Sequence, residues 1–243
     1  MALARAAVAD ADRSTARSGD SGAKELPLEA FAACAAHVVR AHGWVSAERA
    51  RRSSSTASAD LALQVFETAP EAPDGADRAL ATGALRWAQA LLAPKPELTG
   101  FERDALSVVS DGSVLTRRER GLVCALIAVY RSRRARSRHV GSPGMRIDAT
   151  VLVERVVERA SARHGTVRRC ELLDADVNRL VWWQTQGTPL HEGDVLVLRG
   201  RVERHTRFGT TAVTVLAHCR RLAHLPAMNF IAQIEALAFR RLT

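Results

Sequence analysis

Aromatic and basic side chains concentrate in the C-terminal half of the chain, where together they could bind a polyanion. Trp182 and Trp183 are adjacent, and Phe208 lies within the basic segment 204–209. Aromatic rings stack on nucleobases and arginines contact phosphates, so this combination is typical of proteins that bind single strands without reading their sequence. The residue types therefore favour non-covalent binding of single-stranded nucleic acid.

Motifs that would indicate an enzyme or a metal site are missing from the sequence. There is no GxxxxGK[ST] loop, no GxGxxG after a strand, no HExxH and no GxSxG. The eight histidines are scattered, the cysteines form no CxxC pair, and Asp174 and Asp176 are interpreted as turn residues. We predict no catalytic residue, no metal and no cofactor. We interpret the four cysteines as small buried side chains in a reducing, cytoplasmic compartment.

Charge is distributed unevenly along the 243 residues. Residues 1–130 contain 15 basic and 16 acidic side chains, whereas residues 131–243 contain 20 and 10. Only two of the basic residues are lysines, which together with the many alanines indicates a GC-rich coding sequence. Such a bias should raise the arginine content everywhere, so it does not explain an excess in one half. The asymmetry indicates a polyanion-binding surface in the C-terminal half.

A hydrophobic period of two from residue 145 predicts the β-structure that must position these side chains. The first strand is expected around 147–153, where apolar residues alternate. Further strands are predicted near 166–174, 179–185, 194–204 and 210–221. Five strands joined by short turns indicate an OB-type Greek-key barrel, which we assign to residues 144–222. The apolar period of residues 223–243 predicts a closing C-terminal helix.

Alternation along the strands predicts which side chains face outward. In the fourth strand Leu196 and Leu198 face the core, so Arg199 and Arg201 face outward. In the fifth strand the inward residues are expected to be Val213, Val215, Ala217 and Cys219. Val181 would then be the core residue beside those valines. Trp183 shares its face, and Trp182 is predicted to project outward unless a bulge near Asn178 reverses the two.

The N-terminal half is predicted to form a small helical domain over residues 27–130, after a disordered tail at 1–26. Helices are expected at 28–42, around Leu61, from Leu80 to Leu91, and at 100–110 and 117–134. Linkers are expected at 46–58 and 69–76. Thr99 with Glu102, and Thr116 with Glu119, fit helix-capping boxes. We interpret this domain as structural or as a docking module for protein partners.

An arginine-rich segment at 131–143 separates the two predicted domains, with five arginines among its first eight residues. Such a run is either a solvated helix end or linker, or a track for a phosphate backbone, and the sequence leaves both interpretations open. The complete set of predicted nucleic-acid contacts is Trp182, Phe208, Arg168, Arg199, Arg201, Arg204, Arg207, Arg220, Arg134 and Arg136.

Several motifs resemble those of OB-domain proteins carried by bacteriophages and plasmids of high-GC bacteria. The motifs are Arg199-Gly-Arg-Val-Glu-Arg-His205, Phe208-Gly209, Thr214-Val-Leu-Ala-His-Cys219, Gly165-Thr166, Asp174-Ala-Asp176 and Val181-Trp-Trp183. The resemblance covers roughly residues 75–221 and implies a single-stranded-DNA-binding or replication-accessory factor. His218 and Phe208 depart from the basic residue and the tyrosine that the resemblance implies at these positions.

The sequence thus predicts an α+β protein that binds single-stranded DNA in replication, recombination or repair and carries out no catalysis. RNA is an alternative ligand, because stacking on aromatic rings does not depend on the sugar. A protein-binding scaffold with solvated arginines is another alternative. No run of about 18 apolar residues occurs, so no membrane partner is expected.

Overall fold

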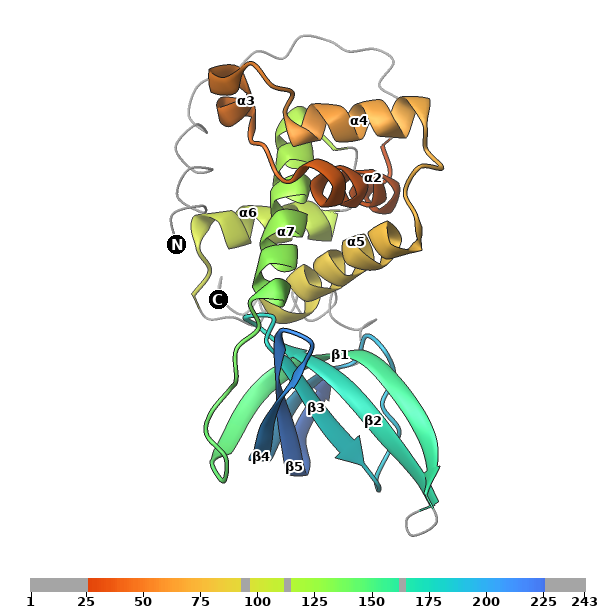
Figure 1. Ribbon diagram of the computed structural model, residues 1–243, viewed down its shortest axis with the longest axis vertical. Helices are drawn as coiled ribbons and strands as arrows, with labels where there is room; N and C mark the ends of the chain where they lie inside the picture. Colours follow the sequence, from red (N-terminus) through yellow and green to blue (C-terminus); the bar gives the residue numbers. More distant parts are fainter. Residues whose placement is uncertain (1–25, 93–96, 112–114, 162–164, 226–243) are drawn as a thin grey trace, which may run out of the picture. The chain divides into compact units, whose positions relative to one another are not determined.

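The computed structural model describes residues 26–92, 97–111, 115–161 and 165–225. The chain divides into two compact units. The first, called the helical unit below, comprises Met1–Ala88 and Lys95–Val129, and the second, the barrel unit, comprises Gln89–Pro94 and Tyr130–Thr243. Figure 1 shows α-helices in the former and a barrel of strands in the latter. The predicted α+β class is confirmed. None of the described helices is both long and apolar enough to cross a membrane.

Six α-helices and one π-helical turn are described. They are α2 (Leu28–His42), α3 (Ala47–Ser53), α4 (Ser58–Thr68), α5 (Gly75–Trp87), η1 (Ala88–Leu92), α6 (Gly100–Asp111) and α7 (Arg117–Ala135). Helix α2 is buried along most of its length and packs against α4 and α5. Both predicted capping boxes are confirmed: the Glu102 and Glu119 carboxylates accept from the amides of Thr99 and Thr116 at 3.0 and 2.7 Å.

The predicted linker at 46–58 is wrong, because it contains helix α3. Ser46 caps this helix by accepting a hydrogen bond from the Arg49 amide at 3.1 Å. Only Ala50 of α3 is buried, so seven residues with one apolar anchor show no helical period in the sequence. The loop between α4 and α5 spans 69–74. It matches the predicted linker at 69–76 except for residues 75 and 76, which begin α5.

Five strands form a closed barrel with the order β1-β2-β3-β5-β4. Their bounds are β1 Arg146–Ser161, β2 Gly165–Asp174, β3 Arg179–Gln184, β4 Val195–Phe208 and β5 Thr211–Leu225. Strands β3 and β5 pair in parallel, and the remaining neighbours are antiparallel. A bulge beside Glu154 lets β1 pair with β4 in its first half and with β2 in its second. The predicted OB-type barrel is confirmed.

The predicted orientation of the two tryptophans is wrong. Trp182 is 8% exposed and belongs to the barrel core with Leu180 and Leu216, whereas Trp183 is 39% exposed. Val181 and Val215 are paired on the outer side of β3 and β5, yet both are buried. Because both faces of these strands are apolar and buried, hydrophobicity alone does not identify the core face.

The predicted arginine-rich linker at 131–143 is corrected in two respects. Residues 131–135 form the last turn of α7. The residues that follow are bonded to the barrel: the Ser137 hydroxyl donates to the Ala212 carbonyl at 2.8 Å and accepts from the Arg179 amide at 2.9 Å. The Val140 amide donates to the Thr214 hydroxyl at 2.9 Å. This segment is therefore part of the barrel unit.

The two ends of the chain fall largely outside the described residues. The predicted tail at 1–26 overlaps them only at Leu26, which is buried. Strand β5 continues to Leu225, three residues past the predicted end of the barrel. The rest of the predicted C-terminal helix at 223–243 lies outside the described residues.

Candidate nucleic-acid interface

An exposed tryptophan and an arginine share the outer side of β2 and β3, and the arginine lies over the exposed ring of a phenylalanine at the end of β4. Arg169 and Trp183 are directly opposite each other across these strands, so their side chains share a face. The Arg169 guanidinium carbon lies 5.1 Å from the centre of the Phe208 ring, within cation–π range. Phe208 is 50% exposed at the end of β4. These side chains present flat apolar surfaces and a cation at one place.

Further arginines belong to the same side of the barrel. The bulge beside Glu154 places Val156 against the core, so Arg155 and Arg159 lie on the outer side of β1. Both are exposed, and neither makes an ion pair within the described residues. We call Arg155, Arg159, Arg169, Trp183 and Phe208 the aromatic face.

One buried carboxylate holds the arginines near the centre of this face. Glu171 accepts from Arg179 at 3.1 Å and pairs with Arg169 at 3.2 Å, so two arginines share a single negative charge. The carboxylate orients both guanidinium groups and offsets only one of their two positive charges. A strand lying on the aromatic face therefore meets fixed cations beside the exposed rings.

The β4–β5 hairpin contributes two of the predicted arginines. Arg207 precedes Phe208 and is exposed. Arg204 is also exposed and pairs only with its neighbour Glu203, at 3.0 Å, which is a weak surface interaction. Both side chains are exposed and therefore accessible to a phosphate, and the hairpin corresponds to a loop that OB barrels use for ligands.

Three predicted arginines lie on the opposite side of the barrel. Arg199, Arg201 and Arg220 are exposed on the outer side of β4 and β5. Arg199 makes two hydrogen bonds to Asp148, at 2.7 and 2.6 Å, and these hydrogen bonds lower the pKa of the Asp148 carboxyl. The structure therefore separates these residues from the aromatic face.

Three other predicted contacts have different surroundings. Arg168 lies on the opposite face of β2 from Arg169 and pairs with Glu158 at 2.7 Å. Arg134 is tied to Glu154 and to the Tyr130 hydroxyl, so its charge is already paired within the barrel unit. Arg136 is exposed just after α7. Arg134 is therefore withdrawn from the predicted site, and Trp182 leaves it because it lies in the core.

Trp183, Arg169, Arg155 and Arg159 are the residues that sequence reasoning missed. Cys170 and Leu172 face the core of the barrel, so simple alternation along β2 places Arg169 on its outer side. Arg155 and Arg159 depend on the bulge in β1, which leaves no signature in the sequence. Trp183 was missed because Val181 lies on the same face of β3 and is apolar, so the sequence indicates that this face is the core face.

The cysteines and the carboxylate-rich turn have structural surroundings. The four cysteines are free, and all but the half-buried Cys219 are buried. Burial raises the pKa of Cys124 and Cys219 to about 12 and that of Cys170 to about 11. Asp174 accepts from the amides of Asp176 and Asn178 at 3.0 and 2.8 Å, as a turn residue does. Among the described residues no cluster of metal-ligating side chains occurs.

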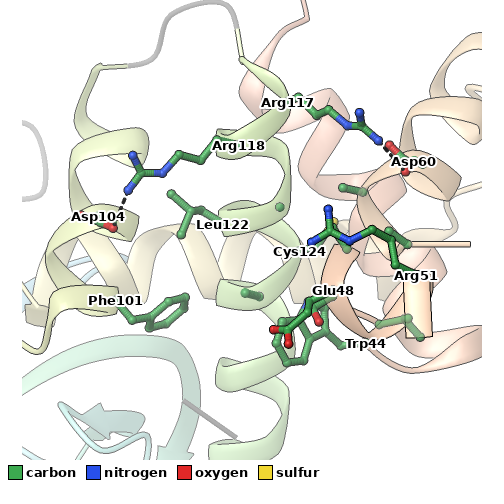
Figure 2. Close-up of a pocket in the computed structure, with 17 residues that line it drawn as sticks. Trp44, Glu48, Arg51, Asp60, Phe101, Asp104, Arg117, Arg118, Leu122 and Cys124 are labelled. Atoms are coloured by element: carbon green, nitrogen blue, oxygen red, sulfur yellow. Dashed lines mark hydrogen bonds and ion pairs between the residues drawn. The ribbon is translucent and has the colours of Figure 1, made fainter. Parts of the chain in front are cut away.

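The helical unit contains a separate pocket of about 300 Å³ between α3, α4, α6 and α7. Its rim is charged, with Arg117 paired to Asp60 at 3.4 Å and Arg118 paired to Asp104 at 3.2 Å, as Figure 2 shows. Arg51 and Glu48 complete three charges of each sign around a mainly apolar lining. The balanced charge makes this pocket a poorer candidate for a polyanion than the aromatic face.

The chain matches no protein-family model, no curated protein and no solved structure. The resemblance to phage and plasmid proteins thus stays a prediction from the sequence motifs. The barrel, the aromatic face and the charges around it are the features that bear on the choice of ligand.

Proposed function

We propose that this chain binds single-stranded nucleic acid without catalysis, with single-stranded DNA as its ligand, in replication, recombination or repair of DNA. The observation that carries the proposal is the exposed Trp183 opposite Arg169 on the outer side of β2 and β3, with the exposed ring of Phe208 from the end of β4 beneath the Arg169 guanidinium. OB barrels bind oligonucleotides on strands two and three and at the loops beside them. The aromatic face occupies this position.

The chemistry of the aromatic face suits a ligand with alternating flat and anionic groups. One base stacks on Trp183 and another on Phe208, while Arg155, Arg159 and Arg169 contact phosphates. Stacking contributes about 1–3 kcal/mol per base and is available to every base. We therefore expect affinity with little sequence preference and a strong dependence on salt.

RNA and protein are the competing ligands. Stacking and phosphate contacts do not depend on the sugar, so preference for DNA over RNA must come from contacts near the 2′ position. A protein-binding barrel would also expose apolar side chains, but it would not require several unpaired arginines around two aromatic rings. The excess of unpaired cations on this side of the barrel favours a nucleic acid.

An oligonucleotide titration tests the proposal. Intrinsic fluorescence of the full chain is followed while single-stranded DNA, duplex DNA or RNA of equal length is added at two salt concentrations. We expect the single-stranded DNA to bind most tightly and its affinity to fall steeply with salt. Equal or tighter binding of RNA would change the ligand class. Absence of binding to all three would leave the scaffold interpretation.

A further inference from the structure

A second cationic surface lies on the side of the barrel away from the aromatic face. It is formed by Arg146, Asp148, Arg199, Arg201 and Arg220, which we call the arginine face. All five side chains are exposed on the outer side of the first half of β1, of β4 and of the second half of β5. Four arginines and one aspartate leave a clear positive excess.

The register places like charges directly opposite one another on this surface. Arg146 faces Arg201 across β1 and β4, and Arg199 faces Arg220 across β4 and β5. Like charges in directly opposed cross-strand positions destabilise a sheet. Asp148 pairs with Arg199 and offsets part of the repulsion, but within the described residues Arg146, Arg201 and Arg220 make no ion pair. The barrel itself gains nothing from this arrangement, whereas a bound polyanion would remove the repulsion.

The two faces differ in chemistry. None of the described aromatic side chains belongs to the arginine face, so it offers phosphate contacts without stacking. In the closed barrel, β5 lies between β3, which carries Trp183, and β4, which carries Arg199 and Arg201. Along β4 itself, Arg201 precedes Phe208 of the aromatic face by seven residues, which corresponds to about 23 Å at about 3.3 Å per residue. A strand of a few nucleotides stacked on Trp183 therefore leaves Arg199 and Arg201 uncovered.

We infer that the arginine face binds the phosphate backbone of a second nucleic-acid strand, so that one chain holds two strands at once. The inference rests on the proposed function of the aromatic face. Backbone contacts made by arginines alone carry no sequence information, so the second ligand is accepted as a single strand or as a duplex. Holding two strands on one chain would bring complementary strands together.

Binding stoichiometry with short strands tests the inference. Oligonucleotides of about five nucleotides are used, because they lie near the lower end of the site sizes of OB folds, about 4–16 nucleotides, and one strand is then expected to occupy one face. Sedimentation of the full chain with saturating labelled strand should give two strands per chain. In the variant with Arg146→Thr, Arg201→Thr and Arg220→Thr we expect one strand per chain, with the affinity of that strand changed less than twofold. Replacing the same three residues with lysine should restore two, and thermal melting checks that each variant folds.

Each other outcome is decisive. One strand per chain in the unmodified protein, lost on Trp183→Ala, would overturn the second site and leave the proposed function standing. Two strands in the threonine variant would place the second site elsewhere and also overturn the inference. If the unmodified chain binds no strand, both proposals fail. Tighter binding of a polyglutamate peptide than of the second strand, lost in the threonine variant, would assign the arginine face to an acidic protein instead. Repeating the measurement with a ten-base-pair duplex as the second ligand distinguishes a single-stranded from a double-stranded occupant.

Discussion

Several arginines in the helical unit are paired with carboxylates, whereas four arginines in the barrel unit occupy directly opposed positions on neighbouring strands. Arg40 contacts both Asp74 and the fully buried Asp77, with Arg40 Nε 2.8 Å from Asp77 Oδ1. In the barrel unit Arg146 faces Arg201 across two strands. The two units use the same residue type, so the difference lies in the surroundings that the fold provides.

This contrast separates arginines that stabilise the fold from exposed arginines that remain accessible to a ligand. A buried carboxylate such as Asp77 needs its cation, because an unpaired buried charge is strongly unfavourable. Exposed arginines opposite each other do not stabilise the sheet, and a coding bias toward arginine does not explain why Arg146 faces Arg201 and Arg199 faces Arg220. The barrel unit is therefore where a polyanion is expected.

The largest expected effects concern the buried tryptophans. Trp87 in the helical unit is fully buried and Trp182 is nearly so in the barrel. Replacing either with alanine should lower the free energy of unfolding by about 3–5 kcal/mol, because each leaves a cavity. Trp183→Ala should lower it by less than about 1 kcal/mol, as expected for a partly exposed side chain. Urea denaturation of the three variants measures this, and a larger loss for Trp183→Ala than for Trp182→Ala would reverse the assigned orientation.

Binding should show the opposite order for the two barrel tryptophans. Trp183→Ala removes one stacking surface worth about 1–3 kcal/mol, which weakens the binding of single-stranded DNA roughly five- to 150-fold. Trp183→Phe keeps a ring and should retain most of the affinity. Fluorescence anisotropy of a labelled strand measures both variants. Unchanged affinity in Trp183→Ala would remove stacking at this position from the mechanism.

Smaller changes in the melting temperature, of opposite sign, are expected when one arginine is removed from each unit. Arg40→Ala should lower the melting temperature, because buried Asp77 loses its cation. Arg201→Thr should raise it by about one to three degrees at low salt, because the repulsion with Arg146 ends and threonine suits a strand. High salt should abolish the gain by screening the charges. A lower melting temperature for Arg201→Thr would mean that the arginine stabilises the barrel after all.

Much of the barrel could be predicted from the sequence because one face of β4 is polar. Leu196, Leu198 and Val202 alternate with exposed arginines, so the period of two identified both faces correctly. Helices α2 and α7 were likewise placed to within one residue at each end, since their apolar residues recur over several turns.

The candidate site was harder to predict because it depends on tertiary contacts. Val181, Val213 and Val215 are buried on the outer side of the barrel, so the sequence offered two apolar faces and the wrong one was chosen as the core. Choosing Val181 as the inward residue of β3 reverses the predicted orientation of both tryptophans, so the sequence predicts Trp182 as the exposed ring in place of Trp183. Arg134 was assigned to the ligand because its partner Glu154 is 20 residues away in the sequence.

The salt dependence of binding tests most directly whether nucleic acid binds at the aromatic face, because the salt slope reports the number of phosphate contacts. Arg155, Arg159 and Arg169 in the aromatic face are replaced together by alanine. A matched variant replaces Arg49, Arg86 and Arg103, which are exposed in the helical unit, and so loses the same charge. Affinity for a ten-nucleotide strand of DNA is measured over a range of salt concentrations, with Trp183 intact in both variants.

We expect the logarithmic salt slope to become shallower by about two units in the barrel variant, at roughly 0.7 per lost phosphate contact. The slope of the helical-unit variant should equal that of the unmodified chain. Equal slopes in all three proteins, or a loss confined to the helical-unit variant, would contradict binding at the aromatic face.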